Sequence, residues 1–261
     1  MGVSARIRSC TVVLALAVSL ASCTRGSSAA SDAVATSTPV TFTTADGVQL
    51  DGRLFGPQNA SGGVVLAHML PADQRSWYSF AQRLADQGYR VLTFDFRGYC
   101  PGGDGGCSQG IKDVDAAPMD LRAAVEKLRA EGVARIGIAG ASMGGTAALL
   151  VAADDPKGIP AVVALSAPQV LNGLAVGPDV LQRVTGAKLY IAGLGDPSGA
   201  APAADAMAAM SPQPVREEIV TTDAHGTDLL TSNQGEHVQQ VIEQWLARWL
   251  AAPPAAATPA G

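Results

Sequence analysis

The segment Gly140–Gly144 matches the pattern Gly-x-Ser-x-Gly, in which a serine stands between two glycines. Once a base removes its proton, a serine hydroxyl attacks carbonyl carbons. Glycines at these positions let a strand turn sharply into a helix and expose the serine. The run Arg-Ile-Gly-Ile-Ala precedes Ser142 as a strand would, and the helix-like run Gly-Thr-Ala-Ala-Leu-Leu comes after it. We therefore predict that Ser142 is a nucleophile.

A second segment, Gly106–Gly110, matches the same pattern around Ser108. It follows a turn-rich loop and precedes Ile-Lys-Asp-Val-Asp, so the strand before the serine and the helix after it are both missing. We predict a structural role for Ser108.

The chain contains only three histidines that could serve as the base. His68 ends an early strand, ahead of the nucleophile in the sequence, and His237 opens the last helix near its apolar stripe. His225 lies in a loop after a predicted strand at 215–221, where a base can reach a serine at the same sheet edge. We predict His225 as the general base; the alternative is a hydrogen-bonded loop histidine.

A carboxylate is needed to hold the imidazole in the correct tautomer and to stabilise its charged form. Asp196 follows an apolar strand directly, in Gly-Leu-Gly-Asp-Pro, and is the predicted acid. Asp179 is the alternative, but it lies in a helix-like stretch. Asp223 and Asp228 are closer to the base in sequence, and we expect both to point to solvent.

Backbone N–H groups must stabilise the oxyanion of an acyl-transfer intermediate. The first predicted donor is Met143, which follows Ser142 at the start of a helix. The second is Met69, after the strand at 63–68, with His68 shaping the turn. The two Met side chains either line the acyl pocket or fill the core.

The elements that must position these residues alternate along the chain. A hairpin followed by strands that alternate with helices predicts an α/β fold, with a mostly parallel sheet covered by helices on both faces. Sites in such sheets lie beyond the carboxyl ends of the strands. The predicted strands are 40–44, 48–55, 63–68, 89–96, 133–139, 159–166, 187–192 and 215–221, and the predicted helices are 77–88, 114–131, 144–153, 198–210 and 237–250.

Together these segments resemble the α/β-hydrolase superfamily over roughly residues 40–250. Gly140–Gly145 is similar to its nucleophile turn, Gly193–Pro197 to its acid loop and Ala224–Leu230 to its histidine loop. Asp95–Tyr99 resembles the loop after its fourth strand.

The resemblance is to the dienelactone-hydrolase-like and carboxylesterase-like members that have no large cap domain, because only about 20 residues separate the strands at 159–166 and 187–192. Ser142 stands where the dienelactone type usually has Cys, and His68-Met69 replaces the usual His-Gly. The resemblance implies a serine hydrolase that cleaves carboxylic esters or thioesters through an acyl-enzyme, with no cofactor or metal. The alternatives are another acyl bond (peptide or lactone), a perhydrolase-type side reaction, or a non-catalytic lipid-anchored binding protein.

The first 22 residues read as a secretory signal. Arg6 and Arg8 precede an apolar run at 11–20 that is too short to span a bilayer. Leu-Ala-Ser-Cys at 20–23 resembles the lipobox of bacterial lipoproteins, which implies a lipid on Cys23 and an exported protein, anchored to the outer face of the bacterial cell membrane or in the periplasm. The alternative is an ordinary signal peptide.

The remaining organisation follows from composition. Residues 23–38 are predicted to be a flexible tether, 39–251 one hydrolase domain and 252–261 a disordered tail. Removal of the signal would take Cys10 away, and Cys23 would carry the lipid, so only Cys100 and Cys107 remain. We predict that these two form a disulfide, because an exported protein meets oxidising conditions. Two thiolates are too few for a metal site.

Charge and composition restrict the partners. The net charge is −5, only 5% of the residues are aromatic, and no dense Lys/Arg stripe appears, which argues against nucleic acid. The expected partners are a small-molecule ester and, through the lipid, a membrane. The oligomeric state stays open.

Overall fold

The computed structural model describes residues 1–2, 36–155 and 157–251. Cys23, nearly all of the predicted signal peptide and tether, and the whole predicted tail lie outside these residues. The strands are β1 (Thr38–Thr43), β2 (Gln49–Phe55), β3 (Gly62–Ala67), β4 (Arg90–Phe94), β5 (Arg135–Ala141), β6 (Ala161–Leu165), β7 (Val170–Leu171), β8 (Leu174–Ala175), β9 (Ala187–Gly193) and β10 (Val215–Val220).

Eight strands of the described residues form one sheet in the order β1-β2-β4-β3-β5-β6-β9-β10. β2 pairs antiparallel with β1 and β4, and every other neighbouring pair is parallel. The hairpin turns at Gly47, whose φ of +87° suits glycine. The predicted hairpin and mostly parallel sheet are confirmed.

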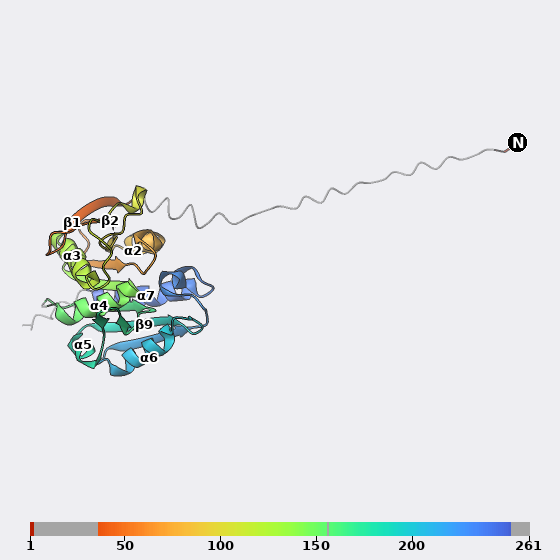
Figure 1. The fold of residues 1–261 in the computed structure, drawn as a ribbon. Helices are drawn as coiled ribbons and strands as arrows, with labels where there is room; N and C mark the ends of the chain where they lie inside the picture. The colour runs from red at the N-terminus through yellow and green to blue at the C-terminus, as the bar shows by residue number, and fades with distance from the viewer. Residues whose placement is uncertain (3–35, 156, 252–261) are drawn as a thin grey trace, which may run out of the picture.

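Helices cover both faces of this sheet (Figure 1). One face carries α2 (Tyr78–Asp86) and α7 (Gly235–Leu250); the other carries α3 (Ala117–Ala130), α4 (Met143–Asp154), α5 (Pro178–Arg183) and α6 (Ala200–Met210). In Figure 1, β1 and β2 lie at one edge, and β9 and α6 lie toward the other.

A hydrophobic core lies on each face of the sheet, because successive side chains of a strand point to opposite faces. On β3, Val65 and Ala67 pack into the core under α3 and α4, whereas Val64 and Leu66 pack into the core under α2 and α7. Alternation is the period of a strand with both faces covered. Burying each such Val or Leu stabilises the fold by about 1.5–3 kcal/mol.

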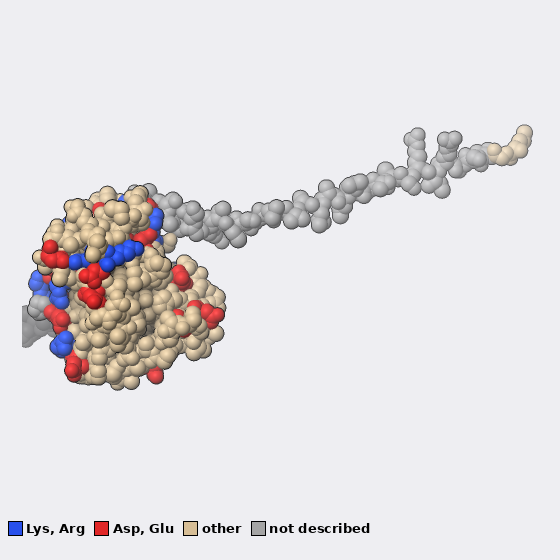
Figure 2. Space-filling view, viewed as in Figure 1, with Lys and Arg blue, Asp and Glu red and all other residues tan. Residues whose placement is uncertain are grey.

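Between β6 and β9 the chain forms only the short β7–β8 hairpin and α5, so no large cap domain covers the carboxyl ends of the strands. The sequence did not predict the hairpin, because strands of two residues leave no periodic pattern. None of the described helices combines the length and the apolar character that crossing a bilayer requires. In the view of Figure 2, charges of both signs lie toward the edges, around a broad area without charged side chains.

Candidate active site

Ser142 stands at the sharp turn between β5 and α4, with φ of +48° and ψ of −114°. The turn is tight enough to require glycine on both sides. A Cβ at Gly140 would lie 2.1 Å from the carbonyl oxygen of Gly144, and one at Gly144 would lie 2.3 Å from the carbonyl oxygen of Ala67. The strand–turn–helix context predicted for Ser142 is confirmed.

His225 and Asp196 meet at the ends of neighbouring parallel strands, β10 and β9. His225 Nδ1 lies 2.7 Å from Asp196 Oδ2. Burial raises the pKa of Asp196, but hydrogen bonds from Ser198 and His225 outweigh it and hold that pKa below its ordinary value. The carboxylate is therefore charged at neutral pH and accepts a hydrogen bond from the Nδ1–H group of His225.

Ser142 and His225 line one cavity of about 280 Å³. No direct hydrogen bond joins them, as is common before a substrate is bound. Nδ1 of His225 is held by Asp196, so Nε2 is the nitrogen left for a proton from Ser142. The other residues that line the cavity are Ser166, Pro168, Gln169, Leu171, Ser198, Gly199, Ala200 and Ala203.

Ser198 is a site residue that the sequence reasoning missed. Its N–H donates to Asp196 Oδ1 at 2.9 Å, and its Oγ lies 3.2 Å from His225 Nδ1. An Asp that accepts from the backbone two residues later forms a common turn, so the run Asp-Pro-Ser was a usable signal. Ser198 thus fixes the orientation of the Asp196 carboxylate.

The segments that carry the two predicted oxyanion donors lie beside one another. Met143 is the first residue of α4, so its N–H has no acceptor within the helix. The carbonyl oxygens of Ala67 and His68 approach Gly144 closely, which places the chain leading to Met69 beside the same helix end. Neither Met side chain lines the cavity; both are buried in the cores.

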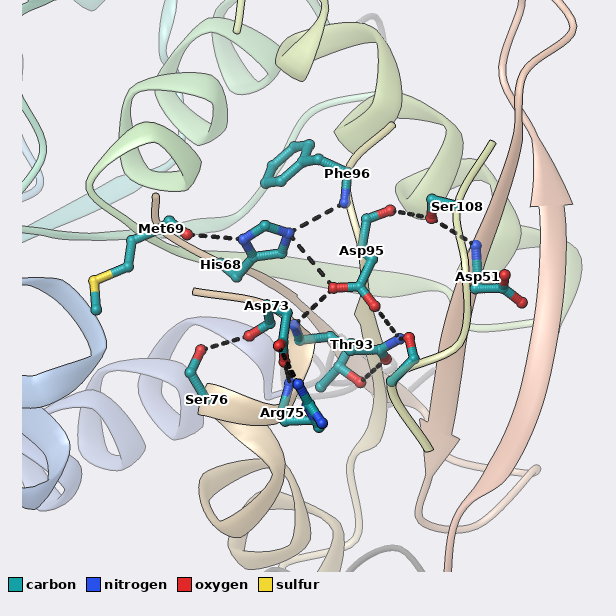
Figure 3. A network of polar contacts seen from close by, with 12 residues as sticks. Asp51, His68, Met69, Asp73, Arg75, Ser76, Thr93, Asp95, Phe96 and Ser108 are labelled. Carbon is teal, nitrogen blue, oxygen red and sulfur yellow. Dashed lines mark hydrogen bonds and ion pairs between the residues drawn. The ribbon is translucent and has the colours of Figure 1, made fainter. Parts of the chain in front are cut away.

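His68 holds the loop that carries Met69 (Figure 3). Phe96 N–H donates to His68 Nε2 at 3.2 Å, so the ring proton sits on Nδ1, which donates to the Met69 carbonyl at 2.9 Å. Burial lowers the pKa of His68 to about 4. The imidazole is therefore neutral, and its approach to Asp95, at 3.7 Å, is not an ion pair at neutral pH.

Asp95 is the second buried titratable group of this network. Both of its carboxylate oxygens accept hydrogen bonds from Gln74, at 2.9 Å and 2.8 Å. Burial nevertheless raises the pKa of Asp95 to about 7. The sequence could not predict this value, because it depends on residues that only the fold brings around the carboxyl group.

Ser108 has the structural role that the sequence predicts. Its Oγ donates to the Asp95 carbonyl at 2.6 Å and accepts from Asp51 N–H at 2.9 Å. The side chain is buried and faces the edge of the network in Figure 3. Beside it, Cys100 and Cys107 form the predicted disulfide.

The alternative triad residues lie elsewhere. His237 is exposed near the start of α7, where the sequence places it, and its Nε2 lies 2.7 Å from Glu218 Oε1. Asp179 lies in the first turn of α5, and Asp223 and Asp228 are exposed, as expected. No group of three metal-binding side chains occurs among the residues that the structure describes.

Comparison with known proteins shows the family to which the chain belongs. A model of the α/β hydrolase fold matches residues 63–208, more than half of the chain. No curated protein matches. An esterase from Pyrococcus furiosus is similar, with 22% identity and a TM-score of 0.70 over 84% of this chain and 96% of that one.

Two further solved structures have a TM-score of 0.67 with this chain. A thermophilic esterase from Thermogutta terrifontis is 19% identical over 82% of this chain and 100% of its own. A dienelactone hydrolase from Anabaena variabilis is 21% identical over 82% of this chain and 98% of its own. Because the family model covers most of the sheet and all of the nucleophile turn, the chain belongs to the α/β hydrolase fold family.

Proposed function

We propose that the protein is a serine hydrolase that cleaves carboxylic esters or thioesters. The observation that carries the proposal is the cavity shared by Ser142, at its strained turn, and by His225, which Asp196 orients. Esterases and a dienelactone hydrolase among proteins of similar fold support the same reaction class.

In the proposed reaction, Ser142 Oγ attacks the ester carbonyl carbon while His225 Nε2 takes its proton. The N–H groups of Met143 and Met69 stabilise the oxyanion. His225 then gives the proton to the leaving alcohol or thiol, and an acyl-enzyme remains on Ser142. Water, activated by His225, releases the acid and restores the serine.

A panel of p-nitrophenyl esters of increasing acyl length tests this proposal. The wild-type protein and Ser108→Ala should hydrolyse the short esters, and Ser142→Ala should not. Activity that survives Ser142→Ala would place the chemistry elsewhere.

We also propose that the protein is exported and is anchored to a membrane by lipid on Cys23. The support is the run Leu-Ala-Ser-Cys at 20–23 behind a short apolar segment. Stable attachment needs more than one acyl chain, because a single chain binds membranes only marginally.

A further inference from the structure

The side chain of Met69 lies over Gly226, the residue that follows the proposed base. A Cβ on Gly226 would lie 2.4 Å from Met69 Sδ. Real Cβ atoms essentially never come within 3.0 Å of such an atom, so only glycine fits beneath this thioether. Figure 3 shows the thioether pointing away from His68, which binds the carbonyl oxygen of Met69. Met69 therefore contacts the His225 loop with its side chain.

Gly226 also lies against the strand that carries the nucleophile. The same Cβ would lie 3.4 Å from Ala141 Cβ, and Ala141 immediately precedes Ser142. Gly226 is buried and has a φ of +55°, which glycine adopts without steric strain. The loop of the proposed base, the loop of the second oxyanion donor and the nucleophile turn thus meet at one glycine.

Met69 has little freedom to move away from this contact. Its carbonyl oxygen accepts the hydrogen bond from His68 Nδ1, at 2.9 Å. The residue is 7% exposed, and its side chain belongs to the same core as Ala141 and Leu229. Because protein interiors are closely packed, a displacement of one of these groups displaces its neighbours. The thioether therefore links the position of the oxyanion loop to that of Gly226.

The contact bears on the reaction through His225. The imidazole is held at Nδ1 by Asp196, at 2.7 Å, and the backbone one residue later is held by Met69. Proton transfer requires Nε2 to come within hydrogen-bond reach of Ser142 Oγ. A misplacement of about 1 Å can cost about 10²-fold in rate. The two supports of His225 therefore matter for catalysis as well as for stability.

We propose that Met69 is a positioning residue through its side chain, which packs on Gly226 and so fixes His225 relative to Ser142 and to the oxyanion donor. The inference rests on the proposed function. The side chain does not line the cavity, so it acts on the reaction only through the loop that it supports. Side-chain variants keep the Met69 N–H, and they therefore test the packing while the oxyanion donor is retained.

The first test truncates the thioether and measures hydrolysis of p-nitrophenyl butyrate. In Met69→Ala, kcat and kcat/KM should fall together by about 10- to 100-fold with KM nearly unchanged, because the packing matters for the transition state and not for binding. Met69→Leu, which fills a similar volume, should keep most of the activity.

Met207→Ala is the matched control, since Met207 is a fully buried methionine in the core on the other face of the sheet. Both alanine variants leave a cavity and should melt several degrees below the wild type. Only Met69→Ala should lose kcat when all variants are assayed well below their melting temperatures. If Met69→Ala does not fold, Met69→Val, which also removes the thioether, takes its place in the comparison.

A double-mutant cycle tests the contact itself. Gly226→Ala places a Cβ against the thioether and should lower kcat by about tenfold in the wild type, but by less than about twofold in Met69→Ala, where the space is vacant. The strain of alanine at a positive φ is present in both backgrounds and cancels in the cycle.

An unchanged kcat in Met69→Ala, an equal loss of kcat in Met207→Ala, or an equal cost of Gly226→Ala in both backgrounds would overturn this inference and leave the proposed function standing. If the wild type does not hydrolyse p-nitrophenyl esters and Ser142 does not react with a phosphonylating probe, the proposed function itself fails, and the inference fails with it.

Discussion

His225 Nδ1 lies 2.7 Å from Asp196 Oδ2, although 29 positions separate the two residues in the sequence. The contact forms because β9 and β10 are parallel neighbours whose carboxyl ends deliver both side chains to one sheet edge. Ser198 binds the other carboxylate oxygen. Two donors therefore hold Asp196 in one orientation.

Replacing Asp196 by Asn should lower kcat by about 10⁴-fold and leave the fold intact, because the amide favours the wrong tautomer of His225. Asp179→Asn is the matched control, since Asp179 lies in α5, outside the cavity. Steady-state kinetics on one short ester compares the two. If Asp179→Asn lost activity and Asp196→Asn kept it, the acid of the triad would be Asp179 in α5.

Asp95 should make the stability depend on pH. Its folded pKa of about 7 exceeds the ordinary value near 4, so the folded state binds the extra proton, and the stability this group provides is lost as pH rises from about 4 to 7. Asp95→Asn removes this loss. The free energy of unfolding of the variant relative to wild type should rise over that range, by on the order of 3–4 kcal/mol, and then level off.

The pH dependence of stability expected from His68 has the opposite sign to that expected from Asp95. Burial lowers its folded pKa to about 4, so the stability that depends on its neutral form is lost as pH falls from about 6.5 to 4. For His68→Asn the difference from wild type should therefore change with the opposite sign. Urea unfolding at several pH values measures both differences, and pH-independent differences for both variants would refute these assignments.

The Cys100–Cys107 disulfide should stabilise the loop that it closes by roughly 2–3 kcal/mol. That loop accepts a hydrogen bond from Gln74 at the Gly105 carbonyl and one from Tyr78 at the Asp104 carbonyl. Changing both cysteines to Ala should lower the melting temperature by about 4–12 °C. Thiol counting on the unreduced protein should find no free thiol at these positions; two would argue against the disulfide.

Cys23→Ala should release the protein from the membrane fraction without loss of ester hydrolysis, because the residue precedes the predicted hydrolase domain at 39–251. Fractionation of cells that produce each form compares their distribution, and mass spectrometry of the mature wild type should find an acylated Cys23. An unmodified Cys23 in that protein would contradict the anchor.

The sequence predicts the candidate catalytic residues of this site because each of them lies in a recognisable short-range pattern. Ser142 follows from its strand–turn–helix context, and His225 and Asp196 follow from strands that end at one edge. The packing of Met69 on Gly226 could not be predicted, since it joins segments that only the assembled fold brings together.

The β7–β8 hairpin also escaped prediction, yet it supplies Leu171 to the cavity wall. The raised pKa of Asp95 likewise depends on burial by distant residues. The cavity wall and the electrostatics of the site therefore cannot be predicted from the sequence, whereas the candidate reacting groups can.

Labelling with a fluorophosphonate, followed by peptide mass mapping, tests the central claim most directly, because such probes react preferentially with activated serines. The account predicts about one adduct per chain, on Ser142, in the wild type and in Ser108→Ala, and none in Ser142→Ala, with ester hydrolysis lost in parallel. An adduct on Ser108, or ester hydrolysis that persists in Ser142→Ala, would contradict it.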